Sequence, residues 1–219
     1  MAKFKNNKKY YLTVEGETEK WYFEWLMNQI NACPNSEYKV SIEAKIQKNP
    51  LKFAKSFTVI GKTEVYHISD YESDEDIHAR QFIETMDNLK KAKNLGKQIN
   101  YKFGYSNFTF DLWIVLHNAD CNGSLVHRSQ YLAYINKIYH KTFESMDEYK
   151  HEDNFKGILL QSTISNVIDA INRAKKIMER NKENGYVLHQ YKGYKYYKEN
   201  PSLAIWEAIE KILKDCKLI

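Results

Sequence analysis

Acidic residues directly follow two apolar segments of the chain. Glu15 comes after the β-branched and aromatic run 10–14, and Asp70 and Glu72 come after a second run at 64–69. Phosphoryl chemistry requires neutralisation of charge at the transferring group, and Mg²⁺ or Mn²⁺ held by a few carboxylate oxygens and waters supplies it. Glu15, Asp70 and Glu72 are therefore the candidate catalytic residues and metal ligands.

The spacing of the neighbouring acids extends this candidate site. Glu72 lies two residues beyond Asp70, so both side chains point to the same side if the chain stays extended. Glu19 lies one helical turn beyond Glu15 and can point back at the same site, which makes it a further candidate metal ligand. The alternative for Glu19 is a first-turn residue that complements the helix dipole, which is also our interpretation of Glu17.

Asp111 stands on a short element, 110–117, that is apolar nearly all round. A carboxylate on such an element is expensive to bury unpaired, so Asp111 needs a partner. A metal, a catalytic lysine or a buried hydrogen-bond network would each satisfy this need, and Asp111 is a candidate metal ligand on that ground. His117 is interpreted as a packed or hydrogen-bonded core histidine, and Asn107 as the cap of this helix.

The stretch 190–198 interleaves tyrosines and lysines around a glycine. Lys192, Lys195, Lys198 and Tyr194 suit stacking on bases and neutralisation of phosphates, so they form a candidate nucleic-acid-binding surface. The alternative is a loop or edge strand whose tyrosines pack on the sheet while its lysines are solvated. Lysines and arginines number 33 against 28 acids, an excess that permits a polyanionic partner without requiring one.

Alternating strands and helices must position these residues. Strands that alternate with helices through the first hundred residues indicate an α/β fold with a mainly parallel sheet flanked by helices and a helical C-terminal extension. Ligands bind outside the carboxyl ends of the strands in such a sheet, where the candidate acids lie. Apolar periodicity predicts strands at 10–14, 38–46, 64–69 and 100–105, and helices at 17–30, from Pro50, from Ser73 to near Gly96, at 164–178 and at 205–213. Ser73 is expected to cap its helix ahead of the acidic first turn Asp74–Asp76.

A single domain is expected over residues 1–219, with an α/β core at 1–119 and a mostly helical extension at 120–219. Three widely separated cysteines indicate neither a disulfide framework nor a zinc site. The chain lacks the apolar stretch of a signal peptide or a membrane span, so we expect a cytoplasmic protein without a membrane partner.

Three segments carry a resemblance to a known family. Residues 106–117, Ser-Asn-Phe-Thr-Phe-Asp-Leu-Trp-Ile-Val-Leu-His, are similar to the hallmark segment of RloB-like proteins. Residues 14–19, Val-Glu-Gly-x-x-Glu, and 200–202, Asn-Pro-Ser, are similar to the two ends of that family, so the resemblance covers nearly the full length. Glu15 and Asp70-x-Glu72 also resemble the glutamate and the Asp-x-Asp pair of the Toprim fold.

The chain departs from the family pattern at three positions. Glu72 stands where the second aspartate is usual, Asp111 replaces a glutamate, and Phe108 replaces a proline. Each carboxylate change moves the oxygens by about one methylene, which shifts metal geometry without abolishing coordination.

The resemblance implies a Toprim-like nuclease of bacterial or phage origin, from a family often encoded beside an ATPase of the ABC or AAA type and linked to phage defence. We therefore expect a magnesium-dependent endonuclease of DNA or of a structured RNA such as transfer RNA, regulated by an ATPase partner. The alternative is a catalytically silent Toprim-fold module that senses nucleotides or binds a partner. A third hypothesis is an effector that is silent until its partner releases it.

Overall fold

A four-stranded parallel sheet forms the centre of the fold. The computed structural model describes residues 5–59, 61–73, 75–123 and 125–219. The strand order is β2-β1-β3-β4, and all neighbouring strands run parallel. The strands are β1 (Asn7–Val14), β2 (Lys39–Ile46), β3 (Thr63–Tyr71) and β4 (Ile99–Asn107).

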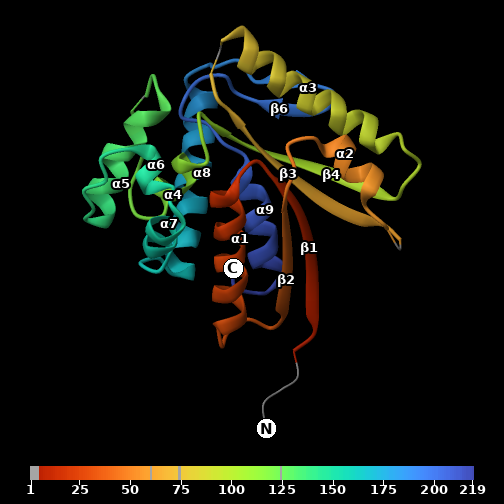
Figure 1. Ribbon diagram of the computed structural model, residues 1–219, viewed down its shortest axis with the longest axis horizontal. Helices are drawn as coiled ribbons and strands as arrows, with labels where there is room; N and C mark the ends of the chain where they lie inside the picture. The colour runs from red at the N-terminus through yellow and green to blue at the C-terminus, as the bar shows by residue number, and fades with distance from the viewer. Residues whose placement is uncertain (1–4, 60, 74, 124) are drawn as a thin grey trace.

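Helices connect these strands and cover both faces of the sheet (Figure 1). The connections are α1 (Glu17–Ala32), α2 (Pro50–Ser56) and α3 (Asp76–Lys93), in chain order. Side chains alternate between the two faces along each strand. Leu12 and Ile68 therefore pack in one core with α1, whereas Val65 and Tyr71 pack in a second core with α2 and α3.

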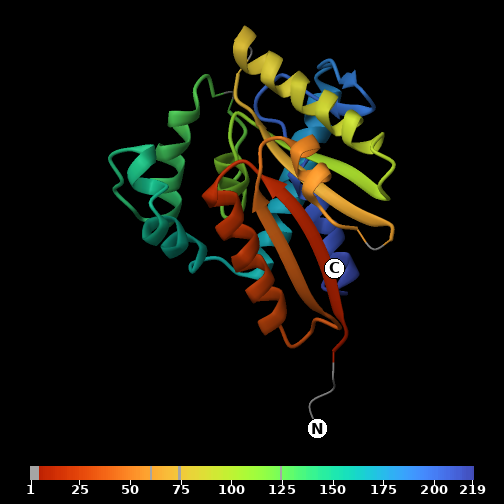
Figure 2. The same ribbon diagram turned by 45° about the vertical axis from the view of Figure 1, so that its right-hand side comes forward.

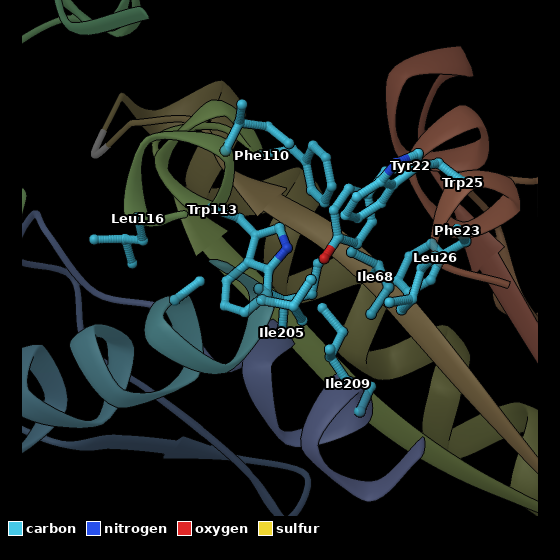
Figure 3. Close-up of a cluster of buried hydrophobic side chains, with 14 of the residues drawn as sticks. Tyr22, Phe23, Trp25, Leu26, Ile68, Phe110, Trp113, Leu116, Ile205 and Ile209 are labelled. Carbon is cyan, nitrogen blue, oxygen red and sulfur yellow. The ribbon is translucent and has the colours of Figure 1, made fainter. Parts of the chain in front are cut away.

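The larger core lies between the sheet, α1 and helices from the C-terminal half (Figure 3). Tyr22 of α1 meets Trp113 of α4 (Asp111–Leu116), with ring centroids 6.3 Å apart in an edge-on arrangement that aromatic quadrupoles favour. Ile209 of α9 (Ile205–Asp215) packs in the same core. All six residues of α4 are buried, which confirms the prediction for the element at 110–117.

The residues after α4 are mostly helical, as predicted, and they also form a short hairpin. Helices α5 to α7 gather at one side of the molecule, away from α2 and α3 (Figure 2). The chain then returns to the sheet, where Ala204 N–H donates to the Tyr105 carbonyl at 2.8 Å and α9 packs on β4. The elements are η1 (Arg128–Gln130), α5 (Tyr131–Tyr139), α6 (Met146–Tyr149), α7 (Glu152–Leu159), α8 (Ile164–Glu183), β5 (His189–Tyr191), β6 (Tyr194–Tyr196) and α9.

This architecture confirms the predicted fold class. The parallel sheet, the helices on both of its faces and the C-terminal helix are consistent with the Toprim-like α/β fold that the resemblance implies. Within the described ranges, every helix is too short or too polar to cross a membrane.

The start of α3 differs from the prediction. The helix begins at Asp76 with Glu75 as its extended N-cap residue, so Ser73 is not the cap. The chain is not yet helical at Ser73, and its hydroxyl instead shares a 2.7 Å hydrogen bond with His78 Nδ1. Asp74 lies outside the described residues.

Asn107 also differs from the prediction, because it does not cap α4. It is the last residue of β4, and the helix begins only at Asp111. Its side-chain amide instead donates to the backbone carbonyl of Lys198, which ties the end of β4 to the segment before α9.

Candidate metal centre

The sheet has a topological switch point between β1 and β3. The chain passes from β1 through α1 to β2 on one side, and then through α2 to β3 on the other side. Loops leave in opposite directions at such a point, which opens a crevice at the carboxyl ends of the strands. Glu15 follows β1 directly and Asp70 is the penultimate residue of β3, so the fold brings both acids to this crevice.

Glu15 is in direct contact with the end of β3. Its Oε1 accepts a hydrogen bond from the backbone N–H of Asp70 at 3.2 Å and a second from the hydroxyl of Ser69. Its Oε2 lies 3.7 Å from Lys48 Nζ. The two hydrogen bonds orient the Glu15 carboxylate against β3 and leave its other oxygen on the side of Lys48.

The side chain of Asp70 is in an environment that disfavours its negative charge. Alternation along β3 places it on the face of Tyr66, towards α1 and α4. Burial, and then the charges of Glu15 and Glu19, raise the pKa of Asp70 well above its usual range. Lys150 opposes this rise only in part. A bound cation would therefore stabilise the ionised form of Asp70.

An open cleft of about 270 Å³ lies over this edge of the sheet. All three candidate catalytic residues, Glu15, Asp70 and Glu72, line it. The remaining wall comes from the start of α2 and from α3 and is mostly polar, with Phe82 as its apolar member and Lys48, Asn49, His78, Gln81, Glu84 and Thr85 among its polar residues. A cleft of this composition suits a polar, charged ligand.

Glu72 faces a histidine and an arginine. Its Oε2 lies 3.4 Å from His78 Nε2 and 3.7 Å from Arg128 Nη1. Arg128 comes from η1, so the C-terminal extension reaches the rim of the cleft. The sequence did not identify His78 or Arg128, because no local pattern links either residue to Glu72.

Asp111 and Glu19 belong to a buried polar cluster that does not line the cleft. Asp111 is 0% exposed, and its Oδ2 accepts hydrogen bonds at 2.9 Å from both Lys150 Nζ and Thr109 Oγ1. Glu19 is also buried and accepts a hydrogen bond from Thr18 Oγ1 at 3.0 Å. The sequence left a metal, a lysine or a hydrogen-bond network open as the partner of Asp111. In the structure its partners are a lysine, Lys150, and the hydroxyl of Thr109.

Lys150 is the residue of this region that sequence reasoning missed. It is the C-cap residue of α6, in a segment where no motif distinguishes it from the other surface lysines. Burial acts to lower the pKa of Lys150, but the charges of Asp111, Asp70 and Glu19 outweigh burial and raise it. Lys150 is therefore an ammonium group that the extension places among three carboxylates.

The carboxylates of the cleft fit a metal site in which phosphates of the substrate supply some of the ligands. Among the described residues, no group of three or more histidine, cysteine, aspartate or glutamate side chains is close enough to hold a metal ion alone. Mg²⁺ is commonly bound through one or two carboxylates, with waters and substrate phosphates as its other ligands. Glu15 and Asp70 fit this pattern, with Glu72 in the same cleft. Glu19 and Asp111 lie outside the cleft, where Glu19 accepts a hydrogen bond from Thr18 and Asp111 pairs with Lys150, so their role as metal ligands stays a prediction.

The β5–β6 hairpin separates its tyrosines from its lysines. Tyr194 is 9% exposed and packs edge-on against Phe103 of β4, with ring centroids 5.4 Å apart. Lys195 and Lys198 are exposed, and Lys192 Nζ lies 3.7 Å from an aspartate of α3. Tyr194 is thus a core residue that offers no ring face to a base, because strand alternation turns it towards the sheet. The lysines remain on the surface.

Comparison with known proteins assigns the chain to a family. No curated protein and no solved structure matches the chain. The model of one family, described as RloB-like protein, matches residues 10–212, a range that runs from β1 into α9 and contains the cleft, the buried cluster and the hairpin. The chain belongs to the RloB-like protein family.

Proposed function

We propose that this RloB-like protein is a metal-dependent endonuclease of the Toprim type that cleaves phosphodiester bonds in DNA or in a structured RNA. Glu15 and Asp70 hold Mg²⁺ or Mn²⁺, and Glu72 joins them from the same cleft. The proposal rests on one observation above all, the contact between Glu15 and the end of β3 at the switch point of a parallel sheet.

Burial, and then the charge of Glu15, disfavours the ionised form of Asp70 in the protein without a bound cation. Such an arrangement lowers the stability of the empty protein, so its presence supports a role in binding a cation. The polar cleft above the two acids is open to solvent and accommodates a phosphate group beside them.

The residues around the two acids have separable roles in this proposal. Ser69 and the backbone N–H of Asp70 orient the Glu15 carboxylate. When bound, the divalent metal supplies charge neutralisation at the phosphate and a lowered pKa for an attacking water. The 2.7 Å hydrogen bond between His78 Nδ1 and the Ser73 hydroxyl orients the imidazole in the cleft, and we assign to His78 the transfer of a proton to the leaving oxygen.

The variant Glu15→Gln tests this function. It keeps the shape of the side chain but removes its charge, so we expect metal-dependent cleavage of DNA and RNA substrates to be lost while the melting temperature stays close to that of the wild type. Glu17→Gln is the matched control, since Glu17 is exposed and forms an ion pair with Lys20 on the surface of α1. Cleavage by Glu15→Gln at the wild-type rate would exclude the proposed site.

A second candidate function is a catalytically silent module that binds nucleotides or a protein partner. The orientation of Glu72 towards His78 and Arg128 favours it, because only two of the three cleft acids are then free to take a metal. This candidate predicts nucleotide or protein binding without cleavage. A panel of DNA and RNA substrates with Mg²⁺ or Mn²⁺ separates the two functions.

We further propose that the endonuclease acts in phage defence and that an ATPase of the ABC or AAA type regulates it. Support for this comes from the family to which the chain belongs. If the ATPase holds the nuclease silent, adding the partner to the active chain must reduce cleavage, and unchanged activity would contradict this regulation.

A further inference from the structure

Two exposed cations flank the carboxylates of the cleft. Lys48 precedes α2 and lies 3.7 Å from Glu15, and Arg128 lies 3.7 Å from Glu72 on the side of the extension. Their side chains are 71% and 57% exposed, so both lie at the surface and neither is part of the core. Each is thus paired with a different candidate metal ligand.

The geometry of these two pairs makes them easy to exchange. A separation of 3.7 Å exceeds the usual hydrogen-bond range of about 2.7–3.2 Å, so neither pair is held by a hydrogen bond. Exposed ion pairs contribute only about 0–1 kcal/mol of stability. The pair of Lys150 with Asp111 is different, because its 2.9 Å contact lies within hydrogen-bond range and joins Lys150 to a carboxylate that is 0% exposed.

A divalent cation on Glu15 and Glu72 would neutralise the charges that attract Lys48 and Arg128, and would repel both side chains. Lys48 and Arg128 would then lie beside the bound metal, and neither side chain would have an anionic partner. The anion that arrives at this site in the proposed reaction is the phosphodiester backbone of the substrate. Arginine and lysine are the side chains that most often neutralise such phosphates.

We propose that Lys48 and Arg128 form a two-sided clamp for the substrate backbone, in which each cation leaves its carboxylate when metal binds and takes a phosphate of the nucleic acid. This inference rests on the proposed function, since it names the substrate contacts of the same site. It also gives the C-terminal extension a direct part in binding, because Arg128 comes from η1.

Binding of labelled nucleic acids in the absence of cleavage tests the clamp. The probes are short fluorescent single-stranded DNA, duplex DNA and a hairpin RNA, measured by anisotropy over a range of salt concentrations with Ca²⁺ in place of Mg²⁺. The variants are Lys48→Ala and Arg128→Ala. Lys52→Ala and Arg80→Ala are the matched controls, because both residues are exposed near the site, on α2 and α3, and neither lines the cleft.

Each clamp variant is expected to weaken binding of the preferred probe by roughly 3- to 10-fold and to reduce the slope of log K against log salt by about one, as loss of one phosphate contact does. The control variants keep the wild-type affinity and slope. Omission of Ca²⁺ is expected to reduce the difference between clamp and control variants, because the cations then remain paired with Glu15 and Glu72.

The inference is overturned if both clamp variants bind with the affinity and the salt dependence of the wild type. It is also overturned if the wild-type protein binds none of the probes. Failure of the proposed function is a separate result. It is detected by measuring Mn²⁺ binding to the wild type and to Glu15→Gln in the absence of nucleic acid. Equal Mn²⁺ affinity of the two proteins would contradict a metal site at Glu15.

Discussion

Replacement of Lys150 by methionine removes the only charged hydrogen-bond donor that the structure places on Asp111 within its described residues. Methionine keeps most of the side-chain length, so the change isolates the ammonium group. Asp111 would then be 0% exposed, with the hydroxyl of Thr109 as its remaining hydrogen-bond donor within 3.5 Å among the described residues and the phenol of Tyr149 nearby, while its Oδ1 already has no partner there. A carboxylate in this position is destabilising because burial disfavours its charge.

Breaking a fully buried pair typically costs about 3–5 kcal/mol. The Lys150 side chain is 35% exposed, so water screens part of the interaction. We therefore expect a loss of about 3 kcal/mol in the free energy of unfolding, at the lower end of that range. Addition of Asp111→Asn removes the unpaired charge and should recover about half of the loss, so the double variant is expected to be about 1–2 kcal/mol more stable than Lys150→Met alone.

The assay is urea unfolding in EDTA, followed by the fluorescence of the four tryptophans and by circular dichroism. The matched control is Lys156→Met, which breaks an exposed pair with Glu152 one turn away on α7 and should cost less than about 0.5 kcal/mol. The reasoning is refuted if Lys150→Met loses no more than this control, or if the double variant is no more stable than Lys150→Met alone.

Two further predictions concern Asp70 and Gly104. The pKa values of Asp70 and Glu19 are raised in the folded protein, so their contribution to stability is fully present below the ordinary carboxyl pKa and is lost as the pH rises through the raised values. In EDTA, Asp70→Asn should therefore flatten this pH dependence and raise the free energy of unfolding at neutral pH by about 1 kcal/mol, and an unchanged pH profile in chemical unfolding would count against it. A Cβ at Gly104 of β4 would lie 2.9 Å from Ile68 Cδ1 and 3.2 Å from Ile205 Cα, so Gly104→Ala should cost about 1–3 kcal/mol by urea unfolding. Its control is Gly157→Ala on α7, where nothing lies within 4 Å and alanine should be neutral or stabilise by about 0.5–1 kcal/mol; equal effects of the two variants would contradict the packing argument.

Local sequence was sufficient for most of the secondary structure. The alternation of Val40 and Ile42 predicted β2, and the apolar stripe of α8 predicted a helix that the structure has at Ile164–Glu183. Both patterns reflect the repeat of a single element, 2 residues for a strand and about 3.6 for a helix, and so need no knowledge of the partner. The start of α3 and the role of Asn107 were wrong, since helix boundaries depend on single hydrogen bonds that a periodic pattern does not specify.

The placement of Glu15 and Asp70 also followed from the sequence. Each acid ends a strand, and parallel strands direct their carboxyl ends to one edge of the sheet. The need for a partner of Asp111 was deduced in the same way, because an apolar element around a carboxylate implies burial whatever the fold.

The identity of that partner depended on tertiary structure, as did the contact of Arg128 with Glu72 and the burial of Tyr194. Each of these three features joins segments that are distant along the chain. The packing of α6, η1 and the hairpin on the sheet decides which lysine or arginine reaches a given carboxylate and which tyrosine is buried. The sequence by itself thus determined the elements, the family and the strand-end acids, which depend on short-range order. The packed fold determined which charges meet at the cleft and which are buried behind it, because those contacts arise only when elements far apart in the sequence share one core.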